Sequence, residues 1–249
     1  MSDIEITRAD GVLTLRLARS AKKNALTARM YETMIDAFTQ ATDDPQIGAI
    51  VLRGGDGIFT AGNDIADFIA AAQQPGDMAA MRFVEALARL DTPLVAAIEG
   101  AAIGIGATLM LHCDLVYAAP DARFHMPFVD LGLVPEAGSS LLLPQRIGLA
   151  RASEILLLGD SFDAAEAHRL GLVNDIVSAD LLYTHAQARA AALAAKPRAA
   201  LSATRHLLRG DRAELQAQLT REGDAFAKAL TSGEAQKAFM AFMARSKGL

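Results

Sequence analysis

Glu136 is the strongest candidate for chemistry in this sequence, because its carboxylate stands among apolar and small residues. The apolar run 131–135 precedes it, and Ala137 and Gly138 follow it. Gly138 and Ser139 can begin a helix in which the serine hydroxyl caps free N–H groups. A carboxylate on such a tight connection is poorly solvated, so we expect its pKa to rise toward the range that suits a general base. The alternative is an ordinary surface glutamate in a turn, which is common in loops.

Two glycine-containing turns could supply the hydrogen-bond donors that accompany such a base. Residues 61–63 (Ala-Gly-Asn) follow a strand pattern, and residues 104–106 (Gly-Ile-Gly) stand at the start of a helix pattern. Backbone N–H groups at a helix start have no partner within the helix and favour negative charge. One donor from each turn could form an oxyanion hole. The alternative is that these small residues only allow close packing.

Asp130 and the run 112–114 also carry side chains that could do chemistry. Asp130 is the nearest rival of Glu136 as a base, but the helix start should aim Glu136 inward, so we favour Glu136. The run 112–114 (His-Cys-Asp) contains metal-ligand residue types. Adjacent residues point in different directions, so this spacing is poor for a metal site.

The elements that must position these residues alternate between strands and helices. The Asp10-Gly11 dipeptide between two alternating runs predicts a hairpin. Further strands are expected at residues 49–52, 94–99, 114–118 and 122–125, with helices at 27–41 and 78–90 between them. This alternation predicts a largely parallel sheet with right-handed crossovers.

The C-terminal part of the chain shows only helical patterns after Ser139. We therefore expect an α/β core over residues 1–195 and a helical region over residues 196–249. Residues 67–77 have weak periodicity, which predicts a mobile segment that could act as a lid.

Composition narrows the class of protein. The 249 residues can form one large domain, and 52% of them are hydrophobic, so a sizeable core is available. The net charge of −5 argues against a nucleic-acid binder. A lone cysteine, Cys113, suits a reducing compartment, and neither a signal peptide nor an apolar run long enough to span a membrane is evident. We expect a soluble cytoplasmic enzyme.

Taken in order, the motifs resemble the crotonase (enoyl-CoA hydratase/isomerase) superfamily over nearly the whole chain. The matching stretches are KKNAL at 22–26, FTAGNDI at 59–65, GAAIGIGATLMLHCDLVYA at 100–118, FHMPFVDLGLVPEAGSS at 124–140 and LLLGDSFDAAEAHRLGLVNDIV at 156–177. The resemblance implies an α/β fold, a spiral of ββα units with C-terminal helices that trimerise. It also implies an acyl-CoA thioester substrate, no metal or redox cofactor, and a homotrimer or dimer of trimers.

The resemblance also assigns the oxyanion hole. Carried over by position, the donors are the backbone N–H groups of Asn63 and Ile105. The family often has glycine where this chain has Ile105, and a backbone donor tolerates the change if φ is ordinary there. The two side chains would then be incidental to the hole.

The carboxylates separate the subclasses of this family. Hydratases that resemble this chain have two glutamates, at positions occupied here by Thr108 and Phe128, and neither of these residues can move the required proton. Glu136 instead stands where many hydratases have glycine. This pattern resembles the Δ3,Δ2-enoyl-CoA isomerases, especially the peroxisomal type. It implies conversion of 3-enoyl-CoA to 2-trans-enoyl-CoA in fatty acid β-oxidation, with Glu136 as the single base.

Residues along the substrate path also follow from the resemblance. They are Lys22 and Lys23 near the CoA phosphates, Ala25, Leu26, Ala61, Asp64 and Ile65 along the adenine and pantetheine, and Phe128 and Leu131 around the acyl group. Asp64 could equally cap the next helix. Phe242 and Arg245 could reach the CoA of a neighbouring subunit, or simply end an amphipathic helix.

Other functions remain open on the sequence. An enoyl-CoA hydratase, or another acyl-CoA chemistry of the superfamily, is the alternative enzyme. A non-catalytic CoA-binding homologue is the alternative of another class, although it would not need a carboxylate at Glu136. An RNA-binding homologue is disfavoured by the acidic charge.

Overall fold

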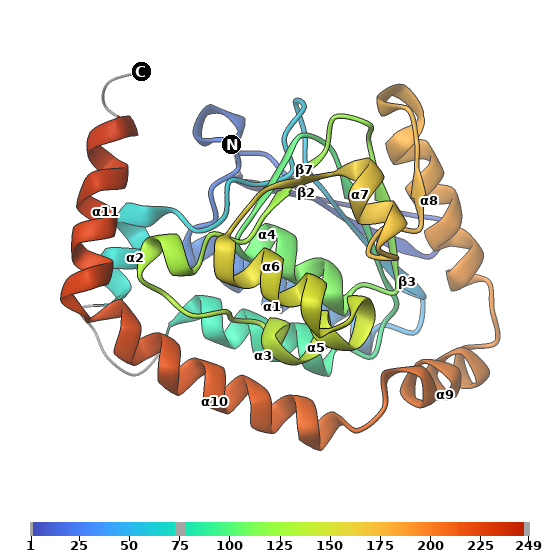
Figure 1. Ribbon diagram of the computed structural model, residues 1–249. Coiled ribbons are helices and arrows are strands. Elements are labelled where there is room, and N and C mark those ends of the chain that lie inside the picture. Colours follow the sequence, from blue (N-terminus) through green and yellow to red (C-terminus); the bar gives the residue numbers. More distant parts are fainter. Residues whose placement is uncertain (1, 73–77, 247–249) are drawn as a thin grey trace.

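The computed structural model describes residues 2–72 and 78–246 as an α/β body with a helical C-terminal region (Figure 1). Its larger sheet has the strand order β1-β2-β3-β4-β6-β9, and a smaller sheet has the order β5-β7-β8. The strands are β1 (Ile4–Ala9), β2 (Val12–Leu17), β3 (Ala49–Arg53), β4 (Leu94–Ile98), β5 (Ala101–Ile103), β6 (Leu115–Ala118), β7 (Arg123–His125), β8 (Phe162–Asp163) and β9 (Asp175–Ile176). All pairs in the larger sheet except β1-β2 are parallel, which confirms the predicted architecture.

The hairpin predicted at Asp10-Gly11 is confirmed. Both residues have positive φ, and β1 and β2 pair in the register Ala9 with Val12. A turn with two left-handed residues matches the right-handed twist of the flanking strands.

Helices cover both faces of the larger sheet. The helices are α1 (Ala28–Asp43), α2 (Ile65–Ala72), α3 (Ala79–Arg89), α4 (Ile105–Thr108), α5 (Ser139–Ile147), α6 (Leu149–Leu158), α7 (Ala164–Arg169), α8 (Ala179–Ala194), α9 (Arg198–Arg209), α10 (Arg212–Leu230) and α11 (Gly233–Ser246). Alternate residues of β3 belong to two cores: Ile50 and Leu52 pack on the side of α1 and α3, while Ala49 and Val51 pack against α8. This explains why the strands read as continuous apolar runs.

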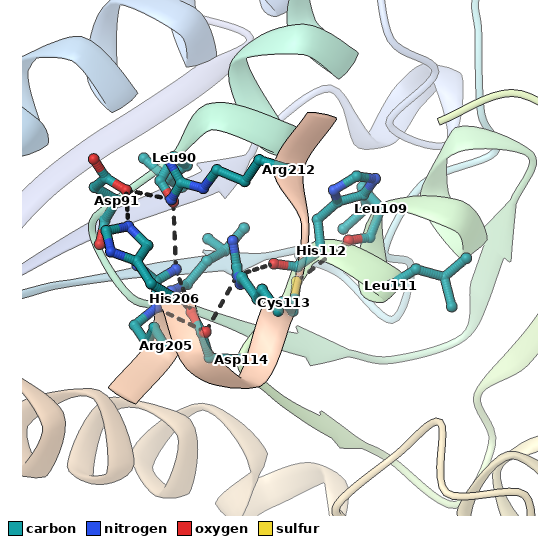
Figure 2. A network of polar contacts seen from close by, with 12 residues as sticks. Leu90, Asp91, Leu109, Leu111, His112, Cys113, Asp114, Arg205, His206 and Arg212 are labelled. Atoms are coloured by element: carbon teal, nitrogen blue, oxygen red, sulfur yellow. Dashed lines mark hydrogen bonds and ion pairs between the residues drawn. The ribbon is translucent and has the colours of Figure 1, made fainter. Parts of the chain in front are cut away.

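The last three helices wrap around one side of the body (Figure 1). Helix α10 packs on α3 and α5, and α11 packs on α10. Ion pairs connect α9 to the body. Asp114 binds Arg205 (Figure 2). It also binds Arg209. Asp91 binds His206 and Arg212 at the edge of the same network.

Two expectations about secondary structure were wrong. Strands β8 and β9 follow Ser139, where only helices were expected. Each has two residues, and so short a segment carries no readable period. Residues 65–72 form helix α2 instead of a mobile segment, and Phe68 is buried against Phe226 and Phe239 of the C-terminal helices. The remainder of the expected lid, residues 73–77, lies outside the described residues.

No helix in the described ranges is long and apolar enough to cross a lipid bilayer.

Candidate active site

Glu136 lies in the turn that leads into α5, with only 7% of its surface exposed. The Thr108 hydroxyl donates a hydrogen bond of 2.5 Å to Oε1 of Glu136. Burial raises the pKa of Glu136 to about 8, the Thr108 hydrogen bond opposes this shift, and the charge of Glu222 adds to it. The expected turn position and raised pKa are both confirmed.

The turn itself has an unusual backbone. Ala137 and Gly138 have φ values of 57° and 68°, in the left-handed region that disfavours residues with a Cβ. The buried ring of His112 holds Ala137, because its Nε2 lies 2.7 Å from the Ala137 carbonyl oxygen. Burial lowers the pKa of His112 to about 4, so the ring is neutral and Nε2 carries the donated proton.

The expectation that a serine hydroxyl caps α5 was wrong. Ser139 Oγ donates to the Glu136 carbonyl at 2.6 Å, and the N-cap residue is Gly138, which has no side chain. The free N–H groups are capped from another element: Glu222 of α10 accepts bonds from the N–H groups of Gly138 at 2.6 Å and Ser140 at 2.9 Å.

Sequence reasoning missed Glu222, although a signal for it exists. Leu219, Phe226 and Leu230 form the buried stripe of α10, and Glu222 falls within this stripe. A carboxylate at a helix position that faces the core is rare unless it has partners. Its partners could not be read from the sequence, because they lie on another helix.

The two expected oxyanion turns lie side by side. Thr60 and Ala102 form a parallel bridge, and a Cβ placed on Gly62 would lie 2.8 Å from the Ile103 carbonyl oxygen. Within the described part of the chain, the N–H groups of Asn63 and Ile105 donate to no protein acceptor. Both groups are therefore free to bind an oxyanion.

Ile105 has the ordinary backbone that the expected donor role requires. It begins α4 and is not among the residues with positive φ. The strained position is taken by Gly104, with φ of 56°, whose N–H donates to the His125 carbonyl at 2.8 Å.

The side chain of Asn63, which was expected to be incidental to the oxyanion hole, has a partner of its own in Tyr31. The buried Tyr31 hydroxyl donates to Asn63 Oδ1 at 2.5 Å. Burial, followed by the charges of Glu136 and Asp67, raises the pKa of Tyr31 well above its ordinary value. Tyr31 is thus a neutral donor near both the base and an oxyanion turn, and sequence reasoning did not single it out.

The residues expected along the CoA part of the substrate lie in two neighbouring loops. The N–H of Ala61 donates to the carbonyl of Lys23, and Leu26 exchanges backbone bonds with Gly62 and Asp64. Lys22 and Lys23 are exposed, while Ala25 and Ile65 are partly buried beside them. A small pocket opens between these loops and α3, lined by Leu26, Ala28, Tyr31, Asn63, Asp64, Asp67, Phe68 and Met78–Ala80.

The carboxylate of Asp64 has structural partners. It binds Arg19 at 2.8 Å and accepts the N–H of Asp67 in the first turn of α2 at 3.2 Å. The helix-capping alternative is therefore confirmed.

The remaining candidate residues differ in how deeply they are buried. Phe128 is buried, and Leu131 is partly buried against the same core. Asp130, the rival base, is exposed and faces Gly159. The side chains of Phe242 and Arg245 lie outside the described residues.

The run of His112, Cys113 and Asp114 does not converge on one point (Figure 2). His112 binds Ala137, the Cys113 thiol contacts the Leu109 carbonyl, and Asp114 pairs with Arg205 and Arg209.

Chemically, the site combines one poorly solvated carboxylate with two free backbone donors. A carboxyl group whose pKa is about 8 can take and return a proton near neutral pH. Adjacent N–H groups can hold the negative charge that develops on a carbonyl oxygen when a neighbouring carbon loses a proton.

Comparison with known proteins identifies the family. The family model "Enoyl-CoA hydratase/isomerase" matches residues 7–248. The probable enoyl-CoA hydratase echA8 of Mycobacterium bovis is 37% identical over 75% of this chain and 72% of its own length. Enoyl-CoA delta isomerase 2 of Rattus norvegicus is 32% identical over 99% of this chain and 64% of its own length. An enoyl-CoA hydratase/isomerase structure from Pseudoalteromonas atlantica T6c superimposes with a TM-score of 0.93 at 39% identity, covering 98% of both chains. The chain therefore belongs to the enoyl-CoA hydratase/isomerase family and has the crotonase fold.

Proposed function

We propose that this protein converts 3-enoyl-CoA to 2-trans-enoyl-CoA, with Glu136 as its single base. The observation that carries the proposal is the isolation of Glu136. It is a buried carboxylate whose pKa is raised to about 8, and it is faced by Thr108, which stands at one of the two positions where hydratases that resemble this chain have a glutamate.

The proposed mechanism uses one proton and one carboxyl group. Glu136 takes a proton from C2 of the 3-enoyl thioester, and the C2 electrons delocalise into a dienolate whose charge rests on the thioester oxygen. The N–H groups of Asn63 and Ile105 stabilise that oxygen, by about 3 kcal/mol for each donor in comparable holes. Protonated Glu136 then gives the proton to C4, and the double bond moves to C2–C3.

The surroundings of Glu136 favour this reaction over hydration. Return of the proton to C4 requires that it not be lost to water, and Glu136 is itself buried, as are the apolar residues Phe128 and Leu133 of the same segment. Hydration requires a water molecule oriented by carboxylates. The Thr108 hydroxyl donates a hydrogen bond to Glu136, so it acts as a support for the base in this structure.

We further propose a cytoplasmic enzyme of fatty acid β-oxidation that uses no metal or redox cofactor and assembles as a trimer or dimer of trimers. Helix α9 exposes Leu207 and Leu208, and α6 exposes Leu149, Leu157 and Leu158. Apolar side chains at the surface of this kind support an assembly that buries them. Light scattering on a sizing column tests this proposal, and a monomeric mass would contradict it.

The activity test compares 3-hexenoyl-CoA with 2-hexenoyl-CoA as substrates. We expect wild type to convert the 3-enoyl ester and to hydrate the 2-enoyl ester poorly, and Glu136→Gln to lose isomerisation by a factor of about 10³ or more. Asp130→Asn is the matched control, because it neutralises a nearby exposed carboxylate. Efficient hydration by wild type would favour the hydratase alternative. Binding of CoA esters without turnover of either would favour a non-catalytic CoA-binding protein.

A further inference from the structure

The carboxylate of Glu222 reaches from α10 into the turn that carries Glu136. Its Oε2 accepts the Gly138 N–H at 2.6 Å, and its Oε1 accepts the N–H of Ser140 at 2.9 Å and the Ser140 hydroxyl at 2.5 Å. Gln218, one turn earlier on α10, donates to the same hydroxyl at 2.6 Å. Side chains of α10 thus cap the Gly138 and Ser140 N–H groups at the start of α5.

A buried carboxylate is energetically unfavourable for a residue whose only role is to pack helices together. Glu222 is 6% exposed, and a buried carboxylate is strongly destabilising unless donors surround it. A leucine in the same stripe would pack α10 against α5 without that penalty. The position of its donors therefore points to a role at the turn.

The link from Glu222 to the base is short and rigid. Gly138 follows Ala137, whose left-handed backbone is held on its other side by the His112 ring. Glu136 comes directly before Ala137, and its own carbonyl is held by the Ser139 N–H and hydroxyl. Release of Gly138 would free the strained segment that aims the Glu136 side chain at Thr108.

The two carboxyl groups differ in the number of donors around them. Burial raises the pKa of Glu222, and the hydrogen bonds from Ser140, Gly138 and Gln218 oppose that shift. Glu136 has one donor, and its pKa is raised by burial and by the charge of Glu222. The other titratable groups that face this turn, Tyr31 from α1 and His112 from the segment after α4, are neutral. No ion pair joins either carboxylate to a lysine or arginine of the described residues.

We infer that Glu222 is a positioning residue for Glu136: it fixes the turn that presents the base, and the negative charge of its ionised form helps the base to hold a proton. This inference rests on the proposed function, in which Glu136 is the base. It makes the active site depend on a helix far along the chain.

The test compares Glu222→Gln with Glu214→Gln, which makes the same change at an exposed position of the same helix. We expect Glu222→Gln to lower kcat for 3-hexenoyl-CoA about tenfold or more, with KM within about twofold of wild type. The acidic limb of its pH profile should move to lower pH, because a nearby negative charge has been removed. Glu214→Gln should leave kcat and the profile unchanged.

Glu222→Asp supplies the second variant, and it decides the matter if Glu222→Gln does not fold. It keeps the charge but is too short to reach both donors, so kcat should fall about fivefold or more while the acidic limb stays in place. A purely structural role would lower the melting temperature of the variants and leave kcat of the folded protein at the wild-type value. That result would overturn the inference.

An infrared titration separates this inference from the proposed function. The Glu136 carboxyl band, identified by its loss in Glu136→Gln, reports the pKa of Glu136 without any substrate. A lower pKa of Glu136 in Glu222→Gln supports the link even if wild type turns over no enoyl ester, which would refute only the isomerase proposal. An unmoved pKa in an active isomerase would overturn the inference and leave the proposed function intact.

Discussion

The carboxyl group of Glu136 holds its proton more tightly in the folded protein than in the unfolded chain, since burial raises its pKa from 4.5 to about 8. Because only the deprotonated form can accept a proton from substrate, kcat/KM for isomerisation should rise with pH and level off above about 8. A pH profile measures this directly. An acidic limb at the ordinary pKa of a glutamate would show that Glu136 is solvated in the working enzyme or is not the base.

The same shift makes a prediction about stability. A raised pKa contributes stability that is fully present below the unfolded value of 4.5 and is lost as pH rises through about 8. Glu136→Gln does not ionise, so its melting temperature relative to wild type should increase by about 5 °C between pH ~5 and pH ~9. Asp130→Asn, at an exposed carboxylate, should show no such trend. Parallel melting curves of Glu136→Gln and wild type across this range would contradict the burial of a titrating group.

The structure reveals Tyr31 as a residue that supports the oxyanion turn at Asn63. Its hydroxyl holds Asn63 Oδ1, so Tyr31→Phe should let that turn shift and lower kcat about tenfold with a smaller change in KM. Tyr183→Phe is the matched control, because Tyr183 donates to Glu99 away from the site. Equal kinetics for the two variants would mean that the Asn63 backbone is positioned without Tyr31.

At this scale the sequence revealed the residues whose motif is local. Glu136, Asn63 and Ile105 stand within short turns. The glycines of these turns indicate a strained backbone and N–H groups without a partner in a helix or strand. Tyr31 and Glu222 act from helices that pack against the site, and the choice of helix face is a tertiary matter. Neither residue type nor spacing could connect them to residues about 30 to 90 positions away.

At the scale of elements, the turn before α5 depends on glycine. Gly138 has φ of 68°, and a Cβ there would lie 2.6 Å from Leu215 Cδ1 of α10. Gly138→Ala should lower the free energy of unfolding by about 1–2 kcal/mol and lower kcat as well, because the turn must move. Gly148→Ala is the control: it has φ of 80° at the other end of α5 but no atom within 4 Å of the added Cβ.

We expect chemical denaturation to show a lower free energy of unfolding in both glycine variants. Enzyme assays should show a lower kcat only in Gly138→Ala. Similar kcat values in the two would separate the geometry of this turn from catalysis. The elements themselves were predicted where they are long and periodic, as for α1 and α3. The two-residue strands β8 and β9 and the packed helix α2 were missed, because their structure follows from neighbours and not from their own pattern.

At the scale of the whole molecule, the C-terminal helices complete the site that the α/β body begins. The larger sheet and its two cores follow from apolar runs that the sequence displays plainly. The docking of α9 and α10 does not, because it depends on charged residues whose partners lie far away in the chain. Asp114 belongs to a run of three residues whose spacing is poor for a metal site. In the structure it binds Arg205 (Figure 2) and also Arg209.

Arg205 is the residue on which this docking depends most. It is 4% exposed, binds Asp114 through two nitrogens at 2.8 and 2.9 Å, and donates to the carbonyls of Leu90 and Asp91. Arg205→Ala leaves buried acceptors without a donor, so it should lower the free energy of unfolding by about 3 kcal/mol. Arg212→Ala, which breaks an exposed pair with Asp91, should cost less than about 1 kcal/mol.

If α10 carries Glu222 into the site, then the loosening caused by Arg205→Ala reaches the base. The variant should become sensitive to proteolysis within residues 196–231 and should lose kcat under conditions in which the α/β body remains folded. Limited proteolysis with mass analysis, run beside the isomerase assay, measures both effects on one sample. Full activity after cleavage in this region would show that the turn before α5 keeps its shape without its partner helix, which the hydrogen bonds of Gly138 and Ser140 to Glu222 argue against.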